Sequence, residues 1–186
     1  MLNPAANPTV LMQREDVRTD LQLTDDQKSK LYDMNQGIRD RFMEVVRQNF
    51  ADDKERTAAF QNIGKKIGEE VIAVLTPAQQ TRLKEIAIQL SGFASATVKD
   101  IQKTLSVTDA QKTKIDDLKA RVDAANKAAV DKMRAGEIQS ADVQDTAKKN
   151  QKVLNEEIGK VLTQPQKDKL KTLGGKIFVP TPETTG

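Results

Sequence analysis

The chain of 186 residues contains no cysteine, no histidine and no tryptophan. Without cysteine it can form no disulfide and has no thiol nucleophile, and without histidine it lacks the commonest general base. The strongest zinc ligands are missing for the same reason. The sequence also contains no glycine-rich phosphate loop and no G-x-S-x-G nucleophile motif. We therefore expect a protein that is not an enzyme and that holds neither a cofactor nor a metal ion.

Aromatic residues are scarce, at 3% of the chain, and hydrophobic residues reach only 37%. Charged residues make up 31%, a composition that favours long helices with narrow apolar seams over a thick core. No segment approaches the roughly 18 apolar residues of a membrane-spanning helix. The formal net charge of +3 is too small to indicate a nucleic-acid binder, and no aromatic stacking platform accompanies the lysines. We expect neither a membrane span nor a nucleic-acid partner.

Four motifs of the form aliphatic-Thr-x-x-Gln stand at residues 23–27, 75–79, 107–111 and 162–166. They form two matched pairs, because residues 17–38 align with residues 101–122. The second motif of each pair aligns as well, together with the Glu-Glu dipeptides that precede it at 69–70 and 156–157. The chain is therefore a tandem duplication of a unit of roughly 85 residues.

Each motif predicts the start of a helix. Threonine is a good N-cap because its hydroxyl accepts a hydrogen bond from an exposed backbone N–H group. Glutamine three residues later accepts a hydrogen bond from the N–H of the cap itself, which completes a capping box. The signature positions are Thr24, Gln27, Thr76, Gln79, Thr108, Gln111, Thr163 and Gln166.

Apolar residues spaced three and four apart predict a helical hairpin in each copy. In the first copy two such stripes flank a turn at residues 51–53, and in the second copy the turn is expected at residues 134–137. A shorter helix is predicted from Asn7 to about Leu21, and another from Pro77 to about Leu90. The first two stripes are Leu31, Met34, Ile38, Phe42 and Val45, then Phe60, Ile63, Ile67, Val71 and Val74.

The predicted fold class is all-α, with two helical-hairpin units at residues 1–93 and 94–175 and an extended tail at residues 176–186. Hairpins with such narrow stripes bury too little apolar surface alone. Each is expected to pack on the other or on a second chain.

The paired motifs around a helical hairpin resemble the LTxxQ (Spy/CpxP-like) family of bacterial envelope proteins. The resemblance covers nearly the whole chain, twice. It implies an all-helical fold, and it implies that the duplication forms a pseudo-symmetric intramolecular dimer, with further oligomerisation left open. It also implies a periplasmic or otherwise extracytoplasmic location, assuming a signal peptide that this chain does not contain. The third motif departs from the pattern by beginning with Val107, and the absence of histidine argues against any link to zinc-binding relatives.

Two functions follow from the resemblance, and the sequence leaves both open. One is ATP-independent, chaperone-like binding of unfolded or partly folded client proteins. The other is stress-response regulation, in which the helical body acts as an adaptor for one folded envelope signalling protein. A chaperone accepts many clients, whereas an adaptor binds one partner with a defined stoichiometry.

Phe42, Phe50 and Phe60 are candidate client-binding residues near the tip of the first hairpin. The alternative is that these rings fill the interior of the hairpin, which is the commoner place for phenylalanine.

Two interpretations are also open for the Glu69-Glu70 and Glu156-Glu157 dipeptides. They could form a cation site or ordinary exposed ion pairs. The ion pairs are favoured because lysines lie within four residues on the same helix faces. These lysines are Lys65, Lys66, Lys152 and Lys160.

Overall fold

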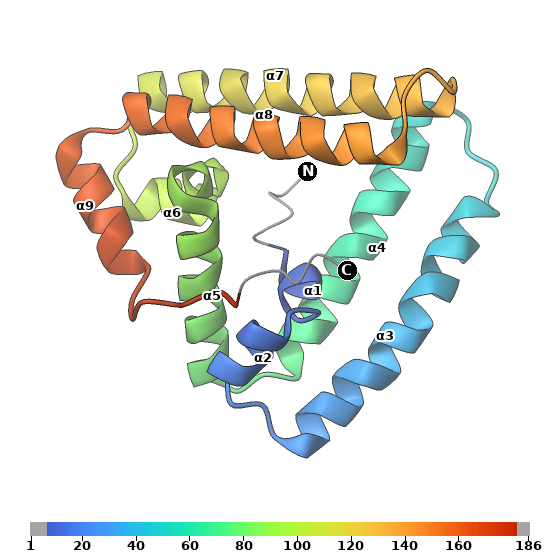
Figure 1. Cartoon of the computed structure of the whole chain (residues 1–186), viewed down its shortest axis with the longest axis horizontal. Coiled ribbons are helices and arrows are strands. Elements are labelled where there is room, and N and C mark those ends of the chain that lie inside the picture. The colour runs from blue at the N-terminus through green and yellow to red at the C-terminus, as the bar shows by residue number, and fades with distance from the viewer. Residues whose placement is uncertain (1–6, 182–186) are drawn as a thin grey trace. The chain divides into compact units, whose positions relative to one another are not determined.

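The computed structural model describes residues 7–181, except for the side chain of Asp53. Every regular element within this range is a helix (Figure 1), which confirms the predicted all-α class. The elements are α1 (Pro8–Leu11), α2 (Glu15–Asp20), α3 (Asp25–Val46), α4 (Asp53–Ala73), α5 (Pro77–Ser91), the 3-10 helix η2 (Gly92–Thr97), α6 (Lys99–Thr104), α7 (Asp109–Arg134), α8 (Ser140–Val161) and α9 (Gln164–Leu173).

These elements belong to two compact units. Of the described residues, the N-terminal unit comprises 7–86 and 176–181, and the C-terminal unit comprises 87–175. The division falls inside helix α5. The domain limits at 93 and 175 rest on the repeat alignment and stay a prediction. Residues 176–181 of the expected tail form neither helix nor strand, while 1–6 and 182–186 lie outside the described residues.

In the C-terminal unit, α7 and α8 lie side by side along the whole hairpin (Figure 1). Small side chains line their seam, where Ala129 is buried and the Asn150 amide donates to Asn126 Oδ1 at 2.7 Å. A Cβ on Gly159 would lie 2.7 Å from a ring carbon of Phe93, so glycine is required for this contact. The buried core of this unit consists of Ala94, Ala96, Leu105, Val107, Ile115, Leu154, Ile158, Leu162 and Leu170.

The hairpin of the N-terminal unit is more open, because the ribbons of α3 and α4 stand visibly apart in Figure 1. Phe42 on α3 stacks on Phe60 of α4, with ring centroids 6.2 Å apart. Asn126 and Ala147 stand at the matching positions of the second copy, so bulkier side chains hold the first hairpin apart. Val45 is the only buried side chain of α3. The core of this unit is formed mainly by Leu11, Met12, Val17, Leu21, Leu23, Ile67, Val71, Leu75, Leu83 and Ile86.

The single helix predicted from Asn7 to about Leu21 is wrong, because the structure has two short helices with a break at residues 12–14. The predicted cap is present, since Asn7 Oδ1 accepts from the N–H of Thr9 at 2.9 Å. Packing accounts for the break. In one continuous helix Met12 and Val17 would project about 140° apart, yet both are buried in this unit.

The chain turns from α2 into α3, and again from α6 into α7, through a residue in the left-handed backbone region. Gln22 has φ 51° and Ser106 has φ 53°. In each case the next N–H returns to the preceding helix, from Leu23 to Arg18 O at 3.4 Å and from Val107 to Gln102 O at 2.9 Å. These are Schellman motifs, which usually place glycine at the left-handed position.

Replacement of Gln22 by glycine should therefore stabilise the fold. Left-handed backbone costs an ordinary residue more than the extra chain entropy that glycine loses on folding, so we expect a gain of about 0.5–1 kcal/mol. Thermal or urea unfolding measures this gain. The control is Gln36→Gly in the exposed middle of α3, which should lower stability by about 1 kcal/mol. Equal losses in both variants would contradict the strained turn.

Candidate functional site

Each signature threonine stands at the N-cap of a helix and shares a capping box with its glutamine. Thr24 Oγ1 accepts from the N–H of Gln27 at 3.2 Å, and Gln27 Oε1 accepts from the N–H of Thr24 at 3.1 Å. The same box begins α5, α7 and α9, at Thr76, Thr108 and Thr163. The aliphatic residues that precede the threonines are buried, namely Leu23, Leu75, Val107 and Leu162.

The two glutamines of the N-terminal unit also bind each other. Gln27 Nε2 donates to Gln79 Oε1 at 2.7 Å, and Gln79 Nε2 donates back to Gln27 Oε1 at 3.0 Å. The second N–H of each amide reaches a backbone carbonyl, Val74 O at 2.9 Å from Gln27 and Leu21 O at 3.1 Å from Gln79. With the cap bonds included, each amide makes two donor and two acceptor contacts, which is its full capacity.

The C-terminal unit repeats this arrangement. Gln111 and Gln166 exchange amide hydrogen bonds of 2.8 Å and 3.0 Å, and their remaining N–H groups donate to Val161 O and Leu105 O. Sequence reasoning assigned these glutamines to caps alone and missed the pairing. The available signal was that both motifs of each copy use glutamine, although aspartate or glutamate can also close a capping box.

Conversion of Gln79 to glutamate should show how much the Gln27–Gln79 hydrogen bonds contribute to stability. A carboxylate can still accept from the N–H of Thr76, but it cannot donate to Leu21 O or Gln27 Oε1. We expect a loss of about 2–3 kcal/mol in the free energy of unfolding, because two acceptors lose their donor. Chemical denaturation at neutral pH measures the loss. The same isosteric change at exposed Gln36 should stay within about 0.5 kcal/mol, and equal effects at both positions would refute the pairing.

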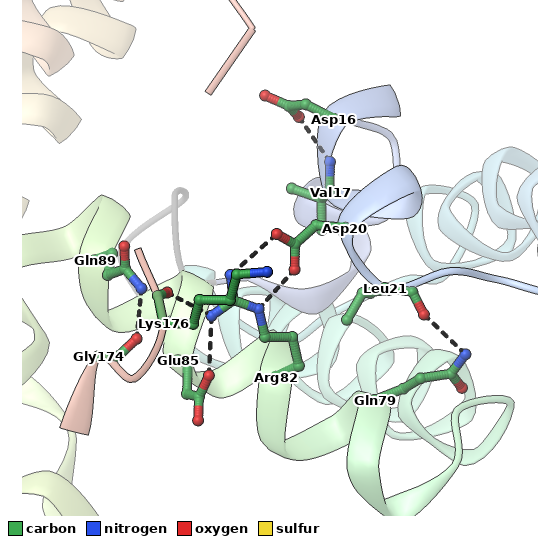
Figure 2. A network of polar contacts seen from close by, with 10 residues as sticks. All are labelled: Asp16, Val17, Asp20, Leu21, Gln79, Arg82, Glu85, Gln89, Gly174 and Lys176. Carbon is green, nitrogen blue, oxygen red and sulfur yellow. Dashed lines mark hydrogen bonds and ion pairs between the residues drawn. The ribbon is translucent and has the colours of Figure 1, made fainter. Parts of the chain in front are cut away.

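A second polar cluster of the N-terminal unit surrounds Arg82 on α5 (Figure 2). The guanidinium binds both carboxylate oxygens of Asp20, Nε at 2.6 Å and Nη2 at 3.0 Å. Nη1 donates to Glu85 at 2.9 Å and to the backbone oxygen of Lys176 at 2.6 Å. Arg82 therefore joins α2, α5 and the segment 176–181, and such bidentate pairs are among the stronger ion pairs in proteins.

Two further contacts hold the segment 176–181 on this unit. Phe178 is buried, and the N–H of Thr181 donates to Asp16 Oδ2 at 3.0 Å. Hydrogen bonding from Arg14 lowers the pKa of Asp16, and hydrogen bonding from Arg82 lowers the pKa of Asp20, with burial opposing both shifts. Both carboxyl groups are thus ionised in the folded chain at neutral pH.

Loss of the Asp20 charge should destabilise the protein in a pH-dependent way. We expect Asp20→Asn to lower the free energy of unfolding by about 1–2 kcal/mol at pH 7. Because folding lowers the pKa of Asp20, its contribution is complete above the unfolded-state pKa of about 3.9 and disappears as pH falls through the folded pKa. The difference between wild type and variant should shrink below about pH 4. Asp33→Asn, at an exposed position with no ion pair among the described residues, is the control.

Of the described helices, α3 carries the most exposed large hydrophobic side chains, and they lie on its outward face. Tyr32 is 66% exposed, Met43 is 40% exposed and Val46 is 56% exposed. Aspartate and lysine, Asp116 and Lys127, replace the first two in the second copy. A groove adjoins this face between α2 and the first turns of α3, and its wall includes Arg18, Gln22, Leu23, Lys28 and Tyr32.

The three candidate phenylalanines are neither buried nor fully exposed. Phe42 and Phe60 stack across the hairpin, and Phe50 lies in the loop between α3 and α4. Each side chain is half-buried, so each retains some accessible ring surface. The structure brings Phe42 and Phe60 together; it records no ring contact for Phe50 with the described residues.

The glutamates of the two Glu-Glu dipeptides each form a separate ion pair with a lysine or an arginine. Glu69 pairs with Lys65 at 3.6 Å and Glu156 with Lys152 at 4.0 Å, both at exposed positions. Half-buried Glu157 pairs with exposed Lys160 at 2.6 Å. Glu70 instead crosses the hairpin to Arg41 on α3, at 2.5 Å. Within residues 7–181 no three acidic side chains converge as a metal site requires.

Comparison of the chain with protein-family models, with curated proteins and with solved structures finds no match. No helix among the described residues is long and apolar enough to cross a membrane.

Proposed function

We propose that this protein is an ATP-independent chaperone of the bacterial envelope, a tandem LTxxQ protein whose two copies form a pseudo-symmetric pair. Its clients are unfolded or partly folded polypeptides. The four Leu/Val-Thr-x-x-Gln motifs support the family assignment, and the matching hydrogen bonds of the two glutamine pairs support descent of both copies from one unit.

The observation that carries the proposal is the outward face of α3. Exposed large apolar side chains that gather on one face are typical of surfaces that bind a partner. Tyr32, Met43 and Val46 lie within about 40° of a common line along α3, and charged side chains surround them. Apolar contacts of this kind can hold a client, while the surrounding charges keep the contact weak and reversible.

The α3/α4 hairpin has the adaptability that varied clients demand. Most of its seam is half-buried, including Leu31, Met34 and Ile38, and methionine fits irregular partners well. The Phe42–Phe60 stack and the Arg41–Glu70 ion pair join the two helices. The α7/α8 hairpin, with its closely packed seam, is the less adaptable of the two.

Light scattering of a chemically denatured globular protein, diluted without nucleotide at near-equal stoichiometry, tests the proposal. Wild type should suppress aggregation. The double variant Tyr32→Asp and Met43→Lys, which gives α3 the residues of the second copy, should lose at least half of the suppression while melting within a few degrees of wild type. Both substitutions are on the surface, where changes in stability are small.

A matched control uses the C-terminal unit. Val153 on α8 is 51% exposed, and its replacement by lysine should leave suppression unchanged. Unaltered aggregation with wild type would contradict the chaperone proposal. Capture of one folded envelope protein at fixed stoichiometry would then favour the alternative role as an adaptor.

A further inference from the structure

Helix α3 differs from its counterpart α7 in charge as well as in apolar content. On α7, Lys119 pairs with Asp123 at one turn's spacing, and Lys127 pairs with Asp131 at 2.6 Å. Within each ion pair the positive charge of the lysine is balanced by the negative charge of the aspartate, so these residues leave no unpaired charge on that face of α7. The positions that match them on α3 are Asn35 and Arg39, and Met43 and Arg47.

On α3, therefore, arginine replaces the acid of each pair, and a neutral residue replaces the base. Arg39 and Arg47 are exposed, and neither makes an ion pair with a described residue. Asp25, at the start of the same face, is paired with Lys28 at 3.3 Å. Two guanidinium groups are thus available on this face.

The arginines alternate with the exposed apolar residues. Arg39 stands two turns after Tyr32 and one turn before Met43, and Arg47 stands one turn after Met43. This ridge, from Tyr32 to Arg47, is roughly 22 Å long. It offers apolar contact and bidentate cationic contact in turn, which is complementary to a segment that carries carboxylates next to large apolar side chains.

We propose that the Tyr32–Arg47 ridge binds unfolded client segments in which glutamate or aspartate alternates with large apolar residues. The inference rests on the proposed function and adds the chemical class of the client. An anionic membrane surface fits the ridge less well. The carboxylates of Asp33, Asp40 and Glu44 lie along its flank. A flat anionic membrane would come close to these carboxylates and be repelled by them, whereas a narrow extended chain can lie on the ridge without approaching them.

The test measures binding of labelled, unstructured peptides of about 15 residues to the full chain by fluorescence anisotropy. One peptide alternates leucine and phenylalanine with glutamate, a second has lysine in place of glutamate, and a third keeps glutamate but has serine in place of the apolar residues. The first should bind about tenfold more tightly than either of the others, and added salt should weaken it, because exposed ion pairs are screened.

Arg39→Asp with Arg47→Asp gives α3 the acidic residues of α7 and should abolish the preference for the glutamate peptide. The control is Arg121→Asp with Arg134→Asp, an equal change of net charge on α7, which should leave the preference intact. Equal losses in both variants would overturn the assignment to the ridge. Self-association of wild type that the α3 variant abolishes would also overturn it, since a second copy would then be the occupant.

Two other results separate the inference from the proposed function. Suppression of aggregation without any preference for the glutamate peptide would refute the inference and leave the chaperone proposal standing. Absence of both would refute the two together. Tighter binding to phosphatidylglycerol vesicles than to the glutamate peptide, lost in the α3 variant, would replace the client segment by a lipid surface.

Discussion

The paired glutamine amides are the constraint on which the rest of each unit depends. One pair connects four helix ends, because Gln27 and Gln79 start α3 and α5 while their second N–H groups bind the carbonyls of Leu21 and Val74. These carbonyls lie at the C-terminal ends of α2 and α4. A side-chain amide whose four contacts are all made tolerates little displacement, so the base of the hairpin is fixed.

Beyond that fixed base, the bulk of the seam residues decides how far the two helices separate. The Asn126–Asn150 contact and the alanines let α7 and α8 approach, whereas the stacked rings of Phe42 and Phe60 require more room. The wider seam leaves α3 with a single buried residue, Val45, and with half-buried residues along the rest of its inner face. The wider seam is thus explained by two phenylalanines within the same hairpin plan, whereas the apolar outward face reflects the residues that stand there, such as Tyr32 and Met43 in place of Asp116 and Lys127.

Much of this fold can be predicted from the sequence, because helix starts and apolar stripes are local signals. The caps of α3, α5, α7 and α9 and the two long hairpins follow from residues close together in the chain. Contacts between distant residues are not local and were missed, including the glutamine pairs and the Arg41–Glu70 ion pair. The break before α2 was missed for the same reason, since burial of Met12 and Val17 depends on what packs around them. Tyr32 lies off the apolar stripe, so no periodicity marked its exposure.

Comparison of the two copies distinguishes features that the fold requires, which both copies share, from features that can differ without loss of the fold. Both retain the same amide pairing and the same strained residue before the first motif of the copy, at Gln22 and Ser106, so these features serve folding in either copy. The outward faces of α3 and α7 take no part in those contacts, and there the residues differ in both charge and polarity. A face that takes no part in folding contacts can change without loss of stability. On this face of α3, Arg39 and Arg47 make no ion pair with a described residue, which is why we propose the binding role for the N-terminal unit.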